Sequence, residues 1–300
     1  MSEQEIRAAK EVAVVGLGNM GRGIARNLDS FGVLCAAFDS DADAFAAAEF
    51  SDGVIEAGIA QILQDARVIL FAVPSCAQIE TILAGFTGRQ GQVIVDLTTS
   101  DPVRSRALSV DLAGRGFSYV DAAMTGGAAG ADAGTLTLMV GGEDGVVASC
   151  SSMLDSISSR KFHLGPVGSG HAMKLVHNMI LHSSFLATCE GLRLAERAGL
   201  DLDSAVEVLN AGNARSYVTE VRFPRDILSG SMMARSHIGN LEKDLGLAED
   251  FAASLDARIP YGEMTRTVLA QALASGHGGT DFSHLFPLYE ELINQLRVEK

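Results

Sequence analysis

The feature that most constrains the fold is a glycine pattern, GLGNMG, at residues 16–21. An apolar run typical of a buried strand, residues 12–16, leads into it, and a helical pattern over residues 19–30 follows. In this setting the first glycine permits a tight turn, the second lets the backbone approach a pyrophosphate, and the third allows close helix–strand packing. The pattern predicts a dinucleotide-binding turn made of Gly16, Leu17, Gly18, Asn19, Met20 and Gly21.

A carboxylate at the end of the next predicted strand specifies which dinucleotide binds. The apolar run that starts at Val33 ends at Asp39, about eighteen residues past Gly21. A carboxylate there accepts hydrogen bonds from the 2′-hydroxyl of the adenosine ribose and repels a 2′-phosphate. Asp39 therefore favours NAD over NADP. The alternative is a glycine-rich turn in which Asp39 only caps a helix, and the strand–turn–helix context makes it the weaker one.

Strand patterns continue to alternate with helical ones through the first half of the chain. The strand patterns cover residues 68–73, 93–97, 118–124 and 136–142, and helical patterns cover residues 42–50 and 102–115. This alternation predicts a doubly wound, Rossmann-type α/β domain with a parallel sheet. Ligands bind beyond the carboxyl ends of such strands, so Val73, Pro74 and Thr99 are candidate cofactor contacts. Thr99 is also placed to cap the helix that follows, and the two roles are compatible.

The pattern changes near Gly165, where the glycine- and proline-rich GPVGSG predicts a linker. Beyond it the periodicity is helical almost throughout, in segments at 204–211, 219–228, 240–257, 261–275 and 282–297. Pro224 makes the second of these the least secure helix. We therefore expect a Rossmann domain at residues 1–167 and an all-helical domain at 168–300. A long helix over about 169–198, ended by Gly199 as its C-cap, joins them.

Lys174 is the only formally charged side chain between Phe162 and Cys189. A helix that is apolar nearly all round is normally buried, and a lysine there must be paired or must lose its proton easily. Such a lysine is a ready proton acceptor or donor, and Asn178 projects from the same helical face. The plainer alternative is a lysine that extends to solvent from a core helix. His171 and His177 flank Lys174 at a spacing of three, where tuning its amine and simple packing are both open.

A second glycine-rich segment, residues 121–142, follows a predicted strand. Gly126 and Gly127 offer backbone N–H groups to a carboxylate, and Thr125 adds a hydroxyl that both donates and accepts. A hydroxyacid requires this pairing of carboxylate donors with a hydroxyl partner near its reacting oxygen. The alternative is an irregular connection at the sheet edge that binds no ligand.

Composition excludes several partner classes. The 300 residues carry a formal net charge of −14, which repels nucleic acid and anionic membranes while leaving room for a locally cationic pocket. Four scattered cysteines without a CxxC pair indicate reduced thiols in the cytoplasm, and no histidine spacing indicates a metal site. We expect no signal peptide at the N-terminus, and the polar residues in the long apolar helix argue against a membrane span.

Four motifs occur in a fixed order: GLGNMG, TGGAAGADAGTLTLMVGG, GSGHAMKLVHN and the Lys243–Asp244–Leu245 segment. In this order and spacing they resemble the β-hydroxyacid dehydrogenase family, which includes 3-hydroxyisobutyrate, tartronate semialdehyde and L-threonate enzymes and, more distantly, 6-phosphogluconate dehydrogenase. The resemblance covers nearly the whole chain. It implies a Rossmann domain joined by a long helix to a helical domain, and a homodimer or homotetramer.

The resemblance also implies residue roles. Lys174 matches the catalytic lysine, and Asn178, Thr125, Gly126 and Gly127 match the substrate-binding groups. Lys243 matches the lysine that approaches both nicotinamide and substrate. The dinucleotide contacts match Gly16, Gly18, Asn19, Met20, Gly21, Asp39, Val73, Pro74 and Thr99. In the implied reaction Lys174 exchanges a proton with the hydroxyl of a small 3-hydroxyacid while NAD takes the hydride.

Two departures from the family pattern bear on the substrate. Thr125 replaces the usual serine, which keeps the hydroxyl and adds a methyl group that narrows the pocket. His177 precedes Asn178, as in the phosphogluconate and threonate branches. Alternatives are an imine reductase, a 6-phosphogluconate dehydrogenase-like enzyme, or a non-catalytic NAD-binding module. The first usually lacks the lysine and prefers NADPH, and the last gives no reason to keep Lys174 and the glycine loop.

Overall fold

The computed structural model describes residues 11–298. The chain divides into two compact units after Lys174. The domain limits expected from sequence, 1–167 and 168–300, stay predictions, and most of the segment in which we expected no signal peptide lies outside the described residues. Each unit has its own hydrophobic core.

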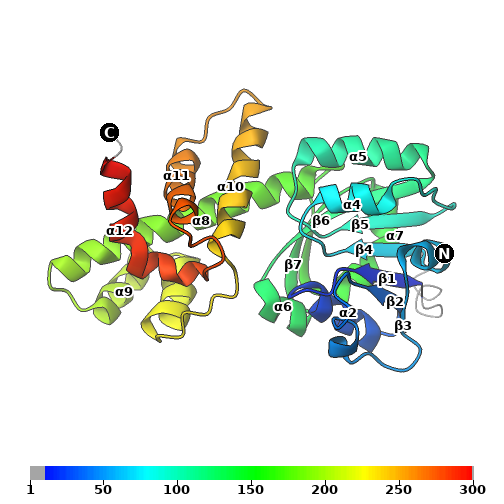
Figure 1. Cartoon of the computed structure of the whole chain (residues 1–300), viewed down its shortest axis with the longest axis horizontal. Helices are drawn as coiled ribbons and strands as arrows, with labels where there is room; N and C mark the ends of the chain where they lie inside the picture. The colour runs from blue at the N-terminus through cyan, green and yellow to red at the C-terminus, as the bar shows by residue number, and fades with distance from the viewer. Residues whose placement is uncertain (1–10, 299–300) are drawn as a thin grey trace. The chain divides into compact units, whose positions relative to one another are not determined.

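The first unit is built on one eight-stranded sheet, in the order β3-β2-β1-β4-β5-β6-β7-β8 (Figure 1). The strands are β1 (Val12–Val15), β2 (Leu34–Phe38), β3 (Ile55–Glu56), β4 (Val68–Phe71), β5 (Gln92–Asp96), β6 (Phe117–Thr125), β7 (Leu136–Gly141) and β8 (Ser158–His163). Neighbouring strands pair in parallel except β6 and β7, which are antiparallel. The predicted Rossmann-type α/β domain is confirmed.

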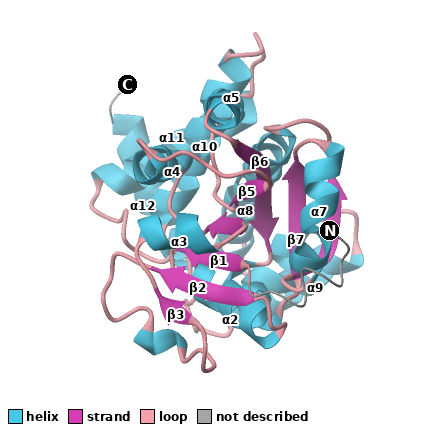
Figure 2. Cartoon of the chain, turned by 90° about the vertical axis from the view of Figure 1, so that its right-hand side faces the viewer, coloured by secondary structure: helices cyan, strands magenta, loops and turns pink. Residues whose placement is uncertain are grey.

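Helices cover both faces of this sheet, with α2 and α3 on opposite sides of β1 and β2 (Figure 2). They are α2 (Gly21–Ser30), α3 (Ile59–Asp65), α4 (Cys76–Leu83), α5 (Pro102–Gly114), α6 (Gly127–Ala133) and α7 (Asp144–Asp155), with a 3₁₀ turn, η1 (Ala46–Ala48). In β1, Val12 and Val14 face the core under α2, α6 and α7, while Ala13 and Val15 face the core under α3, α4 and α5. Burial on both faces explains why the strand sequences are continuous apolar runs.

The second unit is helical, as predicted. After α8 (Ser169–Arg197), which starts in the first unit, come α9 (Leu202–Ala211), η2 (Val218–Leu228), α10 (Ile238–Ala253), α11 (Pro260–Ala274), η3 (Phe282–His284) and α12 (Leu285–Val298). Phe185 of α8 packs edge-on against Phe282 at a centroid distance of 5.1 Å. Gly199, at φ +78°, donates its N–H to Glu196 and ends α8 as the predicted C-cap.

The helix predicted at 42–50 was wrong, whereas the helix predicted at 219–228 forms, with a different hydrogen-bond pattern. Residues 42–50 form only the turn η1 instead of a helix. The Asp41 carboxylate binds the Asp43 N–H, and Arg26 binds the carbonyls of Ala47 and Ala48. Glu49 then adopts a left-handed φ of +53°, which ends the helical path within one turn. The segment around Pro224 is a π-helix, η2, since proline has no N–H to donate to the regular ladder.

Several short elements were not predicted at all: α3, α4, α6, α7, β3 and β8. β8 has the sequence SSRKFH, with a burial pattern that is mostly exposed, because it lies at the edge of the sheet. Because its sequence is mostly polar, β8 lacks the apolar run that predicts the other strands.

Candidate functional site

The dinucleotide turn has the geometry that its glycines predict. Gly16 adopts φ +97°, and a Cβ there would lie 2.6 Å from the carbonyl oxygen of Ala72. A Cβ on Gly21 would collide with the carbonyl oxygen of Gly16. Around Gly18, by contrast, a Cβ would have nothing within 4 Å. The first and third glycines are required by packing within the protein, and the second borders the open space that a pyrophosphate would fill.

Asp39 lies beside this turn. Its Oδ2 accepts the N–H of Leu17 at 2.5 Å, and its Oδ1 accepts the N–H of Asp41 at 2.9 Å. The carboxylate therefore joins the end of β2 to the glycine turn and holds a negative charge there. The turn and this carboxylate fit a bound NAD.

The other predicted groups of the first unit follow the carboxyl ends of parallel strands. Val73 and Pro74 follow β4, Thr99 follows β5, and Thr125 ends β6. The segment around Thr99 is anchored, because the Ser100 hydroxyl accepts the N–H of Cys76 at 2.9 Å and bonds the Thr98 hydroxyl at 2.7 Å. These ends share the edge at which ligands bind in such sheets.

Gly126 and Gly127 are exposed and have left-handed φ values of +127° and +65°. Gly126 lies between β6 and α6, and Gly127 is the first residue of α6, so the predicted loop is a short turn from a strand into a helix. Glycine is favoured at both positions because other residues rarely adopt positive φ.

Lys174 lies in the second turn of α8 and is only 9% exposed. The start of this helix is capped by Asp121, whose carboxylate accepts the N–H groups of Gly168 at 2.7 Å and His171 at 2.9 Å. Asp121 lies in the middle of β6 and is itself fully buried. The helix that carries Lys174 is thus tied to the sheet by a carboxylate on a central strand.

In the helical unit, one carboxylate links two of the predicted substrate residues. Asp244 of α10 accepts the Nδ2–H of Asn178 at 2.6 Å through its Oδ2, and the Nζ of Lys243 lies 3.4 Å from its Oδ1. The Nε2 of His182 is 3.9 Å from the same Oδ2. Asn178, His182 and Asp244 are all at most 9% exposed, and Lys243 is exposed.

Asp244 was missed as a site residue. Its position directly after Lys243, followed by the apolar pair Leu245 and Gly246, marks it as an acidic residue on a buried helix face. Burying an unpaired carboxylate is costly, so this pattern predicts that Asp244 binds a hydrogen-bond donor or a cation, without identifying that residue.

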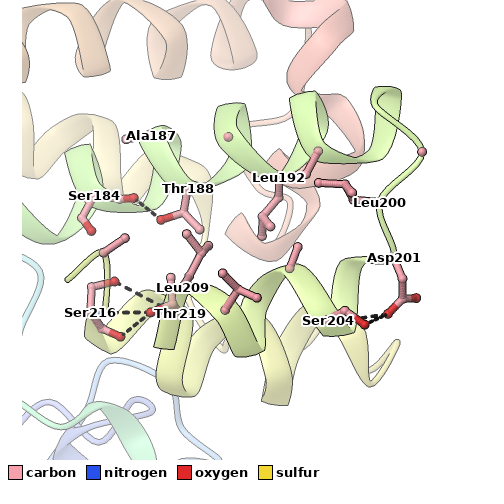
Figure 3. A pocket seen from close by; sticks show the side chains of 16 residues that line it. Ser184, Ala187, Thr188, Leu192, Leu200, Asp201, Ser204, Leu209, Ser216 and Thr219 are labelled. Carbon is pink, nitrogen blue, oxygen red and sulfur yellow. Dashed lines mark hydrogen bonds between the residues drawn. The ribbon is translucent and has the colours of Figure 1, made fainter. Parts of the chain in front are cut away.

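A cavity of about 710 Å³ lies elsewhere in the helical unit, along the C-terminal half of α8 and along α9 (Figure 3). Its hydroxyl groups bond within the protein: Ser204 to Asp201, Thr188 to the Ser184 carbonyl, and Thr219 to Ser216. None of the predicted site residues lines it.

Sequence comparison places these features in a family. Residues 11–165 match the profile described as the NAD binding domain of 6-phosphogluconate dehydrogenase. Residues 168–289 match the one described as NAD-binding of NADP-dependent 3-hydroxyisobutyrate dehydrogenase. The 2-(hydroxymethyl)glutarate dehydrogenase of Eubacterium barkeri is 31% identical over 288 residues, which cover 94% of this chain and 95% of that protein.

The chain belongs to the β-hydroxyacid dehydrogenase family. Another relative, the mitochondrial 3-hydroxyisobutyrate dehydrogenase of Homo sapiens, is 29% identical and covers 96% of this chain and 89% of its own. This β-hydroxyacid dehydrogenase is an oxidoreductase that binds NAD.

Solved structures of the family have the same architecture. The 3-hydroxyisobutyrate dehydrogenase of Mycobacterium tuberculosis, in complex with L-serine, superimposes with a TM-score of 0.83 at 26% identity and covers 92% of this chain and 97% of its own. An imine reductase from Pseudomonas sp. gives a TM-score of 0.62 at 18% identity, covers 92% of this chain and 98% of its own, and shows the shared fold alone. None of the helices within residues 11–298 combines the length and the mean hydropathy that a membrane-spanning helix requires.

Proposed function

We propose that this chain catalyses the reversible, NAD-linked oxidation of a small 3-hydroxyacid resembling 3-hydroxyisobutyrate, with Lys174 as the general acid and base. The observation that carries the proposal is the burial of this lysine in α8, four residues before Asn178. A buried amine exchanges a proton with a substrate more readily than one held by bulk water, because burial disfavours its charged form.

Each chain group has a role in the proposed reaction. In oxidation the neutral amine of Lys174 takes the proton of the substrate hydroxyl, and in reduction the protonated amine returns it to the carbonyl oxygen. Thr125 and Asn178 orient that oxygen. The N–H groups of Gly126 and Gly127, together with Lys243, bind the carboxylate. When bound, NAD accepts the hydride from the hydroxyl-bearing carbon.

The cofactor is held by groups of the first unit. The turn at residues 16–21 binds the pyrophosphate, and Asp39 binds the ribose hydroxyls of the adenosine. Val73, Pro74 and Thr99 are further proposed contacts of the cofactor, at the carboxyl ends of β4 and β5. The loop after Asp39 supports NAD over NADP, because Asp41 and Asp43 add negative charge beside the Asp39 carboxylate, which repels a 2′-phosphate.

The names of the relatives narrow the substrate class. 2-(Hydroxymethyl)glutarate, 3-hydroxyisobutyrate and the L-serine bound in the M. tuberculosis structure share a hydroxymethyl group on the carbon next to a carboxylate. They differ in the third substituent of that carbon. We infer that the substrate of this chain has the same hydroxymethyl group on the carbon next to a carboxylate. We also infer that the methyl of Thr125 limits the size of the third substituent on that carbon.

The proposal is tested by a screen of NAD reduction with 3-hydroxyisobutyrate, 3-hydroxypropionate, glycerate, serine, threonate and 6-phosphogluconate. General acid–base catalysis contributes about 10²–10⁴-fold, so Lys174→Ala should lower kcat by that factor and leave NADH affinity within about twofold. Lys161→Ala, which removes a lysine bound to Asp155 on the sheet unit, is the matched control. Turnover by Lys174→Ala at the parent rate contradicts the proposed base, and inactivity of the parent on every hydroxyacid contradicts the reaction.

The same proposal covers assembly and location. We propose a homodimer or homotetramer, supported by large apolar side chains that are exposed on the helical unit, among them Ile180 and Leu194 of α8. We also propose a cytoplasmic location, supported by four free thiols. Light scattering coupled to gel filtration measures the first, and fractionation of the native cells measures the second.

A further inference from the structure

The first turn of α8 rests on a buried polar cluster that the mechanism does not use. Its centre is His171, which is fully buried and lies three residues before Lys174. The imidazole Nδ1 is 2.7 Å from the Ser105 hydroxyl of α5, and Nε2 is 3.7 Å from Oδ1 of Asp96 at the end of β5. The N–H of His171 is the one bound by Asp121. One residue therefore contacts three elements of the sheet unit.

The partners of His171 are themselves fixed. The Ser105 hydroxyl lies 3.0 Å from the Asp101 carbonyl and forms a hydrogen bond with Nδ1 of His171 at 2.7 Å. Asp96 accepts the Tyr119 hydroxyl at 2.6 Å and the Thr98 N–H at 2.8 Å. Burial and the nearby Asp96 charge raise the pKa of Tyr119, which keeps that hydroxyl a donor. The groups that contact the His171 ring are therefore held in place by hydrogen bonds of their own.

Packing also leaves the start of α8 little freedom to move away from the groups that contact His171. A Cβ on Gly170 would collide with the carbonyl oxygen of Met139 in β7 and would lie 2.9 Å from the Asp121 carboxylate. The backbone at Gly170 is therefore in close contact with the sheet. The ring contacts of His171 fix the rotation of α8 about its own axis.

We propose that His171 is a positioning residue, which sets the rotation of the first turns of α8 on the sheet and thereby the place of the Lys174 amine. Residues three apart share one face of a helix, so a rotation at His171 moves Lys174 with it. The role rests on the proposed function of Lys174. A misplacement of about 1 Å at a reacting group costs about 100-fold in rate, so a small rotation is enough to matter.

The second flanking histidine has a different setting. His177 is half-buried, and its Nδ1 lies 2.9 Å from the Oδ1 of its neighbour Asn178. That contact stays within α8, so it holds the asparagine amide and does not anchor the helix to the sheet. His171 and His177 lie at the same spacing from Lys174 in the sequence, but they have different contacts in the structure.

Two variants of His171 test the proposal. His171→Leu removes both ring contacts and should lower kcat about 10- to 100-fold while leaving KM for NAD within about twofold. His171→Gln keeps a side-chain donor and acceptor in the same direction and should recover most of the lost kcat. His277→Gln, in the turn after α11, is the matched control and should match the parent. Should His171→Leu fail to fold, Ser105→Ala removes only the Nδ1 partner and should show the same kcat-selective loss, smaller in size.

A readout that needs no substrate separates this proposal from the proposed function. The rate at which Lys174 is acetylated by acetic anhydride, measured by mass spectrometry, reports the setting of its amine. It should change in His171→Leu and return toward the parent in His171→Gln, even for a parent inactive on every hydroxyacid. Unchanged kcat and acetylation in His171→Leu overturn the proposal. So does a loss of equal size in both variants that extends to NAD affinity, because it indicates a structural role only.

Discussion

Asn178 of α8 donates its side-chain Nδ2–H to Oδ2 of Asp244 in α10 at 2.6 Å, and both residues are buried. The amide is thereby oriented, since its Oδ1 faces the Nδ1 of His177. An asparagine that would otherwise turn freely about its last bond presents one defined edge. The same carboxylate is in ion-pair contact with Lys243, so one acidic residue holds two predicted substrate groups.

Asp244→Asn should therefore impair catalysis more than its small change in shape suggests. A hydrogen bond to a charged group contributes about 1.5–3 kcal/mol, and each 1.36 kcal/mol corresponds to tenfold in rate. We expect kcat/KM for the hydroxyacid to fall about 10- to 100-fold with NADH affinity unchanged. Steady-state kinetics measure this, with Asp250→Asn on an exposed position of the same helix as the control. Parental kcat/KM in Asp244→Asn would show that this carboxylate holds nothing that the reaction uses.

Gly21 is packed closely against the protein, whereas Gly18 borders open space, so the two should respond differently to substitution by alanine. Gly18→Ala adds a methyl group in open space, so it should weaken NADH binding at unchanged melting temperature. Gly21→Ala forces its Cβ against the Gly16 carbonyl and should lose about 1–3 kcal/mol of stability together with NADH binding. Titration of NADH fluorescence and thermal melting measure the two effects. An equal loss of stability in both variants contradicts the assignment of Gly18 to the cofactor.

Asp39→Asn should relax the preference for NAD. It keeps an acceptor for the Leu17 N–H and removes the charge that opposes a 2′-phosphate. We expect the ratio of kcat/KM for NAD to that for NADP to fall about tenfold. Asp52→Asn, at an exposed position, should leave the ratio unchanged. A parent that already prefers NADP refutes this account of Asp39.

Asp281 should make stability depend on pH. Burial raises the pKa of this carboxyl, but hydrogen bonds from Ser283, Ala234 and Arg235 outweigh burial and hold it below its ordinary value of 3.8. A lowered pKa in the folded state contributes stability above 3.8, which is lost as the pH falls through the folded value. The urea midpoint of Asp281→Asn should be below that of the parent at pH 7, and the gap should close below pH 3.8.

The control for this prediction is Asp250→Asn, whose urea midpoint should follow the parent across the range. A gap between the parent and Asp281→Asn that stays constant from pH 7 to pH 3 contradicts the titration argument, because it indicates a loss independent of charge.

Much of the fold was determined by local sequence. The GLGNMG turn, the apolar strands such as β1 and β4, and the long helix ended by Gly199 each follow from period, glycine and proline. These signals are local because backbone geometry and burial of both sheet faces act on consecutive residues. The family motifs added Lys174, Asn178 and Lys243 as candidates without saying what holds them.

Only tertiary structure decided the partners of the polar residues. Asp244, Asp121 and Asp96 each bind a residue that lies between 23 and 66 positions away in the sequence. A buried carboxylate takes whatever donor the fold brings to it, and that donor is not encoded by local periodicity. In the same way, the carbonyl groups of Ala47 and Ala48 in the short turn η1 accept hydrogen bonds from Arg26 of α2, which lies 21 and 22 positions away.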